Sequence, residues 1–249
     1  MSRRLPENGP RDVTVVMAFY DNPTMLKRHY EMMRGYDDET RSRMRLIIVD
    51  DGSPRWPAEP GDPGLPLEIY RMKVDVRWNQ DACRNLGVAR SKTPWVLLTD
   101  IDHMIPAKTA RYVTRAPLSR SIAYRFSRVN DPNMDPYKPH PNSWLMTKEV
   151  YEKVGGYDER FAGYYGTDGD FRNRVSDVVP LQQLDAVLIR VPREVTPDAS
   201  TTTYKRKDQQ DSDNIPRIMA ERAAIPNWRP LRLLFPWEKV YPTEGGRDA

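Results

Sequence analysis

Cysteine and histidine are scarce in this sequence. Cys83 is the single cysteine among 249 residues, which excludes an internal disulfide and a zinc site built from cysteines. The three histidines, His29, His103 and His140, are too scattered to form the His-x-x-x-His pair of a metal-binding helix. The glycine-rich fingerprints of dinucleotide sites and P-loops are missing as well. These absences exclude zinc-finger and Rossmann-type cofactor chemistry.

Long hydrophobic runs are also missing. The longest apolar stretches, Val13–Tyr20 and Trp95–Leu98, are far shorter than the roughly 20 residues that a membrane-spanning helix needs. No apolar leader follows the N-terminal Met-Ser-Arg-Arg, which argues against secretion. We therefore expect a soluble, cytoplasmic protein without a membrane span.

Apolar, β-branched runs alternate with segments of helical periodicity in the first hundred residues. The predicted strands are Thr14–Phe19, Arg45–Val49, Leu67–Met72 and Trp95–Thr99, and the predicted helices are Asn22–Tyr36 and Asn79–Arg90. Between them, proline at every third position of 54–66 predicts an exposed loop without core residues. This order is typical of an α/β fold, with a mostly parallel central sheet flanked by helices.

After Pro106 the alternation of strand-like and helix-like segments becomes less regular. Asn142–Thr147 is strand-like, Lys148–Val154 has the pattern of a short helix, and a further helix is predicted at Ile215–Ala224. We predict an N-terminal tail (1–11), one main domain (12–192) and a polar C-terminal extension (193–249) packed on or beside it.

Two acidic clusters follow predicted strands. Asp50-Asp51 and Asp100-Ile101-Asp102 both stand at carboxyl ends, where parallel sheets bind their ligands. Asp100 and Asp102 are spaced to reach one hard cation, Mg²⁺ or Mn²⁺, although two solvated loop aspartates are the alternative. Asp51 is placed to accept the N3–H of a uracil base, and the alternative is an ordinary Asp-Gly turn.

A third cluster, Gly163–Phe171, combines glycines, tyrosines and acids. Glycine allows a backbone to approach a ligand closely, and Asp168 is a candidate general base for an acceptor hydroxyl. Asp170 is interpreted instead as the cap of a helix that begins near Phe171.

Four segments together resemble the family 2 glycosyltransferases of the GT-A fold. They are Val15–Asp21 (VVMAFYD), Ile47–Ser53 (IIVDDGS), Asp81–Asp102 (DACRNLGVARSKTPWVLLTDID) and Asn142–Phe171 (NSWLMTKEVYEKVGGYDERFAGYYGTDGDF). They correspond in order to the opening strand, the base-binding loop, the stretch leading to the DxD motif and the acceptor region with its catalytic base. The resemblance implies a GT-A catalytic domain over residues 12–192.

The resemblance also implies roles for residues in the nucleotide site. Asp51 would bind the uracil of a UDP-sugar donor, with Ala18, Tyr20 and Asn79 around the base. Asp100 would contact the ribose or the water shell of the metal.

For the reaction itself, the resemblance implies that Asp102 binds the Mn²⁺ or Mg²⁺ that bridges the diphosphate. Asp168 would deprotonate the acceptor hydroxyl as it attacks the anomeric carbon. A single displacement of this kind inverts the anomeric configuration.

The chain departs from the family pattern at two places. Thr167 stands where relatives often have Glu, and no histidine follows the predicted base to complete the metal site. These departures leave open a nucleotide-sugar-binding protein without turnover; a nucleotidyltransferase is a second alternative. His103 is interpreted as an exposed loop residue or a helper of the metal. His140 and Trp144 are candidate donor or acceptor contacts, with core packing as the alternative for Trp144.

Basic residues are concentrated in residues 103–150, which hold eight Lys and Arg against three acids, whereas the net charge of the whole chain is +4. Five arginines fall between Arg111 and Arg128. We expect from this an anionic acceptor contacted by Arg111, either nucleic acid with a hydroxylated base or a phosphorylated lipid or polysaccharide. The alternative is a solvated helix face, with Arg111 and Arg115 one turn apart.

Overall fold

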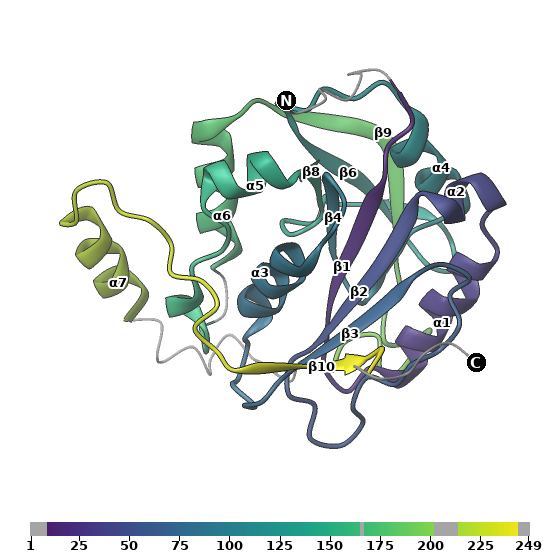
Figure 1. Cartoon of the computed structure of the whole chain (residues 1–249), viewed down its shortest axis with the longest axis horizontal. Coiled ribbons are helices and arrows are strands. Elements are labelled where there is room, and N and C mark those ends of the chain that lie inside the picture. Colours follow the sequence, from purple (N-terminus) through teal and green to yellow (C-terminus); the bar gives the residue numbers. More distant parts are fainter. Residues whose placement is uncertain (1–8, 165–166, 202–213, 244–249) are drawn as a thin grey trace.

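The computed structural model describes residues 9–164, 167–201 and 214–243, and it contains one large sheet covered by helices on both faces (Figure 1). The strands are β1 (Val13–Phe19), β2 (Met44–Asp50), β3 (Leu67–Met72), β4 (Trp95–Asp100), β5 (His103–Met104), β6 (Ala123–Asn130), β7 (Asp135–Tyr137), β8 (Trp144–Thr147), β9 (Leu181–Arg190) and β10 (Trp237–Tyr241). The helices are α1 (Pro23–Arg34), α2 (Asp38–Ser42), α3 (Gln80–Arg90), α4 (Ala107–Arg115), α5 (Lys148–Val154), α6 (Asp168–Val178) and α7 (Asn214–Ala223), with a 3₁₀ turn, η1, at Glu159–Phe161.

The strand order is β10-β3-β2-β1-β4-β8-β6-β9-β5, with β7 paired to β6. The block β3-β2-β1-β4 is parallel throughout. Its register places Phe19 beside Asp50 and Ala18 beside Asp100, so the ends of three strands meet at one edge. The predicted α/β fold with a mostly parallel sheet is confirmed, and antiparallel strands β10 and β8 extend the block on both sides.

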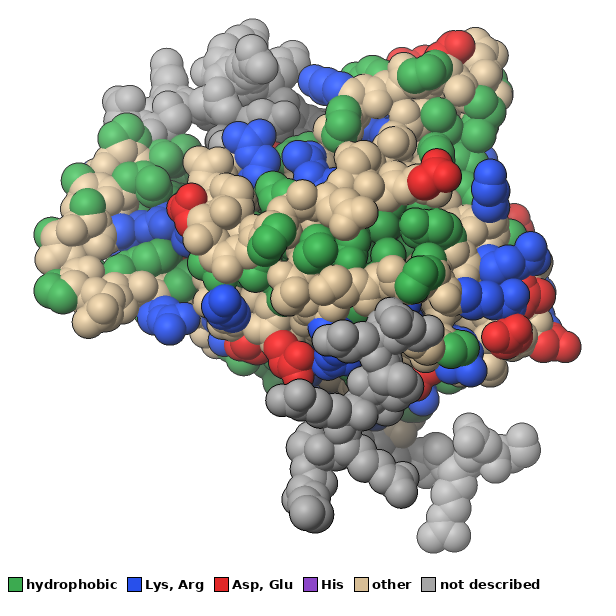
Figure 2. All heavy atoms as spheres, turned by 90° about the horizontal axis from the view of Figure 1, so that it is seen from above, with side chains coloured by type: hydrophobic (Ala, Val, Ile, Leu, Met, Phe, Trp, Pro, Cys, Tyr) green, Lys and Arg blue, Asp and Glu red, His purple; other side chains and the backbone are tan. Residues whose placement is uncertain are grey.

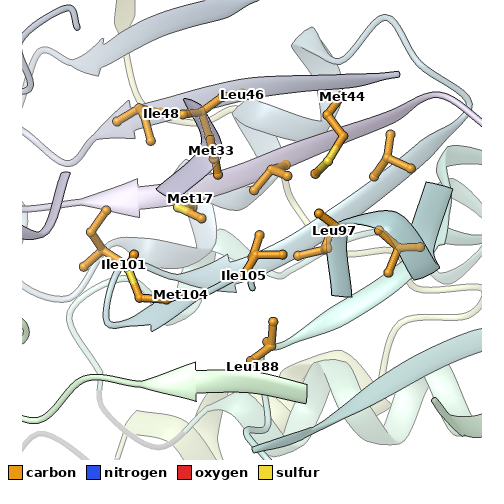
Figure 3. Packing of buried hydrophobic residues seen from close by; sticks show 14 of the residues in the cluster. Met17, Met33, Met44, Leu46, Ile48, Leu97, Ile101, Met104, Ile105 and Leu188 are labelled. Atoms are coloured by element: carbon orange, nitrogen blue, oxygen red, sulfur yellow. The ribbon is translucent and has the colours of Figure 1, made fainter. Parts of the chain in front are cut away.

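The core lies on both faces of the sheet, because every residue of β1 is buried and successive side chains point to opposite faces. On one face Met17 belongs to the cluster that includes α1 and α4, part of which is shown in Figure 3. On the other face Val16 packs with α3, α5 and α6. A Cβ on Gly87 of α3 would lie 2.2 Å from Val16, so glycine lets this helix lie close against β1.

Several elements were missed by the sequence interpretation. β9 is a ten-residue strand next to β6, and β10 lies within the segment predicted to be a polar extension. β10 pairs antiparallel with β3 and adds an edge strand to the main sheet, whereas α7 projects from the side of α6 (Figure 1). No helix among the described residues is long and apolar enough to cross a membrane.

Candidate active site

A pocket of about 410 Å³ opens at the sheet edge where β1, β2 and β4 end. Five residues singled out from the sequence line it together: Ala18, Tyr20, Asp51, Asp100 and Asp102. Ligand sites beyond the carboxyl ends of parallel strands follow from this architecture. The pocket is therefore the candidate active site.

The two aspartates after β2 have different environments. Asp50 accepts hydrogen bonds from the backbone N–H groups of Ser53 (2.8 Å) and Ala58 (3.0 Å), so it shapes the following loop. Asp51 Oδ2 accepts the N–H of Asn79 at 3.2 Å, while its Oδ1 is buried without a partner among the described residues. Burial raises the pKa of the Asp51 carboxyl well above its usual range.

Asn79, at the start of α3, is fully buried, and neither Oδ1 nor Nδ2 has a hydrogen-bond partner within the part of the chain that the structure describes. Together with Asp51 Oδ1, three polar atoms beside the pocket are thus unsatisfied, which is uncommon in folded proteins. Tyr20 donates its hydroxyl to Asp75 at 3.2 Å, and burial together with Asp75 raises its pKa to about 12. This end of the pocket offers a neutral phenol, an amide and a carboxyl group.

Asp100 is held by two partners. Its Oδ1 lies 2.5 Å from Arg84 Nη2, and its Oδ2 lies 3.2 Å from His140 Nε2. The backbone N–H of Asn142 donates to His140 Nδ1 at 3.3 Å, so Nε2 is the nitrogen that donates to Asp100. Burial favours the neutral carboxyl, but Arg84 and His140 outweigh it and hold the pKa of Asp100 well below its usual range.

Arg84 was missed by the sequence interpretation, although it lies within the third resembling segment. Its side chain is 1% exposed, and its guanidinium also donates to Gln80 (2.7 Å) and Asp81 (3.1 Å). Positions 80, 81 and 84 share one side of a helix, which is a signal readable from the sequence. Burial raises the pKa of Asp81 to about 7, because Arg84 only partly offsets it and Asp168 adds to it.

Asp102 is oriented by a buried histidine. Its Oδ1 lies 2.6 Å from His103 Nδ1, and Arg128 Nη1 donates to His103 Nε2 at 2.8 Å. The interpretation of His103 as an exposed loop residue is wrong: it lies in β5 with 0% exposure, because the chain turns back at Asp102 to pair with β9. His103 thus lies between Asp102 on its Nδ1 side and Arg128 on its Nε2 side.

The donor set fits a divalent cation that is shared with a diphosphate. Asp102 Oδ2 has no hydrogen-bond or ion-pair partner among the described residues, and both Asp100 and Asp102 line the pocket. Mg²⁺ sites of this class use one or two carboxylates and complete their shell with phosphate oxygens and water. Residues 9–164, 167–201 and 214–243 contain no group of three or more His, Cys, Asp and Glu that would hold a metal without such help.

Asp168 is the first residue of α6, and its Oδ1 accepts Asn142 Nδ2 at 2.6 Å. Asn142 and His140 belong to one short loop, so that loop contacts both the predicted base and Asp100. The expectation that Asp170 caps a helix beginning near Phe171 is wrong. The helix begins at Asp168, and Asp170 instead accepts from Arg174 and Arg222.

Six predicted site residues do not line the pocket: Asn79, His103, His140 and Asp168, described above, and Trp144 and Arg111. Trp144 is 0% exposed in the core and meets Phe171 edge-on, so its ring presents no face to a sugar. Arg111, on α4, donates to Asp37 at 3.2 Å, and Arg115 donates to the same carboxylate. Figure 2 shows basic and acidic side chains next to one another at the right-hand end of the molecule. Arg111 thus lies on a solvated helix face, the alternative given above, and the structure adds its ion pair with Asp37.

One wall of the pocket is formed by residues 199–201, for which no sequence pattern indicated a role in a binding site. Ala199, Ser200 and Thr201 line the pocket, and Thr201 Oγ1 donates to the carbonyl of Tyr20 at 2.5 Å. Asp198 Oδ2 accepts the N–H of Thr24 at 2.6 Å and so joins this segment to the start of α1. The chain beyond residue 193 thus contributes to the pocket as well as to the sheet.

No protein-family model and no curated protein matches this sequence. Solved structures do match. TarS from S. aureus (residues 1–349), in complex with UDP-GlcNAc, has a TM-score of 0.58 at 10% identity over 86% of this chain and 68% of its own. GalNAc-T7 with UDP, GalNAc and Mn²⁺ gives 0.56 at 13% identity, over 74% and 44% of the two chains. The fold is that of the GT-A glycosyltransferases.

A third structure, the mannosyltransferase PcManGT from Pyrobaculum calidifontis with GDP-Man and Mn²⁺, has a TM-score of 0.53 at 16% identity, covering 75% of this chain and 60% of that one. The chain therefore spans less than half of GalNAc-T7 and three fifths of PcManGT. Similarity at these identities establishes the GT-A fold alone.

Proposed function

We propose that this protein is a metal-dependent, inverting glycosyltransferase that moves a sugar from a UDP-sugar to an acceptor hydroxyl. The observation that carries the proposal is the joint placement of Asp51, Asp100 and Asp102 around one pocket at the sheet edge. The GT-A fold supports it, and three matched glycosyltransferases were solved with nucleotide sugars or UDP.

Different residues bind the base and the diphosphate of the donor. Asp51 and Asn79 offer unpaired polar atoms to the edge of the base, and Ala18 and Tyr20 line the same end of the pocket. Asp102, with help from Asp100, would hold a Mn²⁺ or Mg²⁺ ion, which when bound neutralises charge on the departing diphosphate. Arg84 and His140 keep Asp100 ionised and fixed for that role.

The transfer itself needs one base. Asp168 takes the proton of the acceptor hydroxyl, whose oxygen forms a bond to the anomeric carbon. The bond from that carbon to the diphosphate oxygen breaks, and its electron pair leaves with UDP. Attack from the side opposite the leaving group inverts the configuration. Asn142 holds Asp168 in place for this step.

The test is UDP release from a panel of UDP-sugars with Mn²⁺, followed by NMR assignment of the anomeric configuration of the product. Metal-dependent binding of UDP without any release, across donors and acceptors, would instead assign a nucleotide-sugar-binding protein. No binding of UDP or a UDP-sugar would overturn the proposal. Nucleic acid and other anionic polymers remain acceptor hypotheses for the same assay.

A further inference from the structure

Arg172 and Arg125 form no ion pair among the described residues, and Arg172 stands close to the candidate base Asp168 in the sequence. Arg172 follows Asp168 by four residues on α6, which places both side chains on one flank of the helix, with Cβ atoms about 5–6 Å apart. Asp170 and Arg174 lie on the other flank and pair with each other at 2.9 Å. Arg172 is exposed and forms no ion pair among the described residues.

Arg125 reaches the same place from the sheet. It stands opposite Trp144 in the pairing of β6 with β8, and its guanidinium lies over the Trp144 ring, 5.2 Å from the centroid. The same ring meets Phe171, the residue before Arg172, at 5.9 Å. Arg125 therefore lies on the face of the sheet that α6 covers. The packing of Trp144 brings the two cations to one region.

Arg125 is incompletely paired. Its Nη2 donates to the carbonyl of His140 at 2.9 Å, but its Nε is buried without a partner within the described part of the chain. Burial, and then the charge of Arg172, lower the pKa of Arg125, which agrees with two cations facing each other. An oxyanion between them would relieve this repulsion and satisfy the buried donor.

Three other arginines of residues 103–150 form ion pairs with acids, whereas Arg128 donates to the carbonyl of Lys138 and to His103. Arg111 and Arg115 pair with Asp37, and Arg120 pairs with Glu149 at 3.1 Å. Arg125 is the arginine of 111–128 that combines the lack of an acidic partner with an unsatisfied buried Nε among the described residues. The ion-paired Arg111, Arg115 and Arg120 do not form a row of free cations of the kind that a nucleic acid backbone requires. Two guanidinium groups suit a phosphate, whose several oxygens accept from both at once.

We propose that Arg125 and Arg172 form a phosphate-binding subsite beside Asp168, and that the acceptor is a phosphorylated sugar or polyol held through that phosphate. The assignment of this acceptor class rests on the proposed function, in which Asp168 is the base. In such an acceptor the hydroxyl is only a few bonds from the phosphate. Binding of the phosphate at Arg125 and Arg172 therefore brings the hydroxyl within reach of Asp168.

The test titrates inorganic phosphate into the protein, with and without saturating UDP and Mg²⁺, by isothermal calorimetry. Arg172→Gln is the principal variant, because this exposed position leaves the core intact. Arg125→Gln is the second variant. Arg217→Gln is the matched control, since it removes one exposed arginine from α7. We expect Arg172→Gln to weaken phosphate binding roughly 10- to 100-fold and the control to leave it unchanged.

Equal phosphate binding by wild type and Arg172→Gln, or none by wild type, would overturn the subsite. Failure of UDP to bind would count against the proposed function alone, because the titration without UDP still reports on the arginines. With a donor that turns over, glucose 6-phosphate should have a lower KM than glucose, and Arg172→Gln should remove that difference with little change in kcat. Tighter binding of duplex DNA than of glucose 6-phosphate would replace this proposal with a nucleic acid acceptor.

Discussion

The guanidinium of Arg84 lies 2.5 Å from Asp100 at the end of β4 and 3.1 Å from Asp81 on its own helix. One buried cation thus forms ion pairs with two carboxylates at the edge of the sheet where the pocket opens. Its position depends on α3, which Gly87 allows to lie against β1. The packing of a helix on a strand and the charge state of the candidate active site are therefore linked.

Replacing Arg84 by Met should lower the free energy of unfolding by about 3–5 kcal/mol, because two mostly buried carboxylates lose their counter-charge. Urea denaturation measures the change. The control is Arg217→Met, which breaks an exposed pair with Glu221 and should cost no more than about 0.5 kcal/mol. Equal stability of the two variants would contradict the ion-pair assignment.

Asp102→Asn should abolish the Mn²⁺-dependent part of UDP binding and leave the melting temperature nearly unchanged, because Asp102 is partly exposed and the amide keeps its shape. Calorimetric titration of UDP with and without Mn²⁺ measures this. Asp185→Asn, an exposed position in β9, removes the same charge elsewhere and serves as the control. Mn²⁺-dependent affinity that persists in Asp102→Asn would remove Asp102 from the metal site.

Asp168→Asn should reduce turnover by roughly 10²–10⁴, because the amide cannot accept the proton of the acceptor. The affinity for the UDP-sugar should change little, and steady-state kinetics combined with donor titration separates the two effects. Asp170→Asn is the informative comparison. It should lower stability, because Arg174 and Arg222 lose their partner, while the protein that remains folded keeps its turnover. Normal turnover in Asp168→Asn together with lost turnover in Asp170→Asn would assign the base role to Asp170 instead.

The carboxyl of Asp81 should make the free energy of unfolding depend on pH. Its folded pKa, about 7, lies above the value of about 3.9 in unfolded chains, so the folded state binds the proton more tightly. The resulting stabilisation is complete below about pH 4 and is lost as the pH rises through 7. Asp81→Asn should therefore flatten the pH dependence of the unfolding free energy between pH 4 and 8. A variant that keeps the wild-type slope would show that another group causes it.

Sequence patterns predicted the part of the fold that local composition determines. The strands β1 to β4 are buried apolar runs, and their ends identify Asp51, Asp100 and Asp102 as candidate ligands without tertiary information. β10 was missed because its residues are only half-buried and its partner, β3, is distant in the chain.

The rest of the site depends on contacts that no local pattern contains. His140 reaches Asp100 across a loop, and the buried state of His103 follows from the pairing of β5 with β9. Thr201 reaches Tyr20 through a segment that had the composition of a surface tail. The charge count of residues 103–150 does not reveal that Asp37, which precedes α2, pairs with both Arg111 and Arg115.

The pairing of β10 with β3 has a consequence for synthesis of the chain on the ribosome. β3 is made long before β10, and until then one edge of the parallel block presents unpaired N–H and C=O groups together with Tyr70, which Trp237 later packs against at 5.7 Å. Such edges invite pairing with other chains. Nascent or prematurely terminated chains that lack β10 should therefore be the aggregation-prone species, and chaperones that shield strand edges should matter most during that interval.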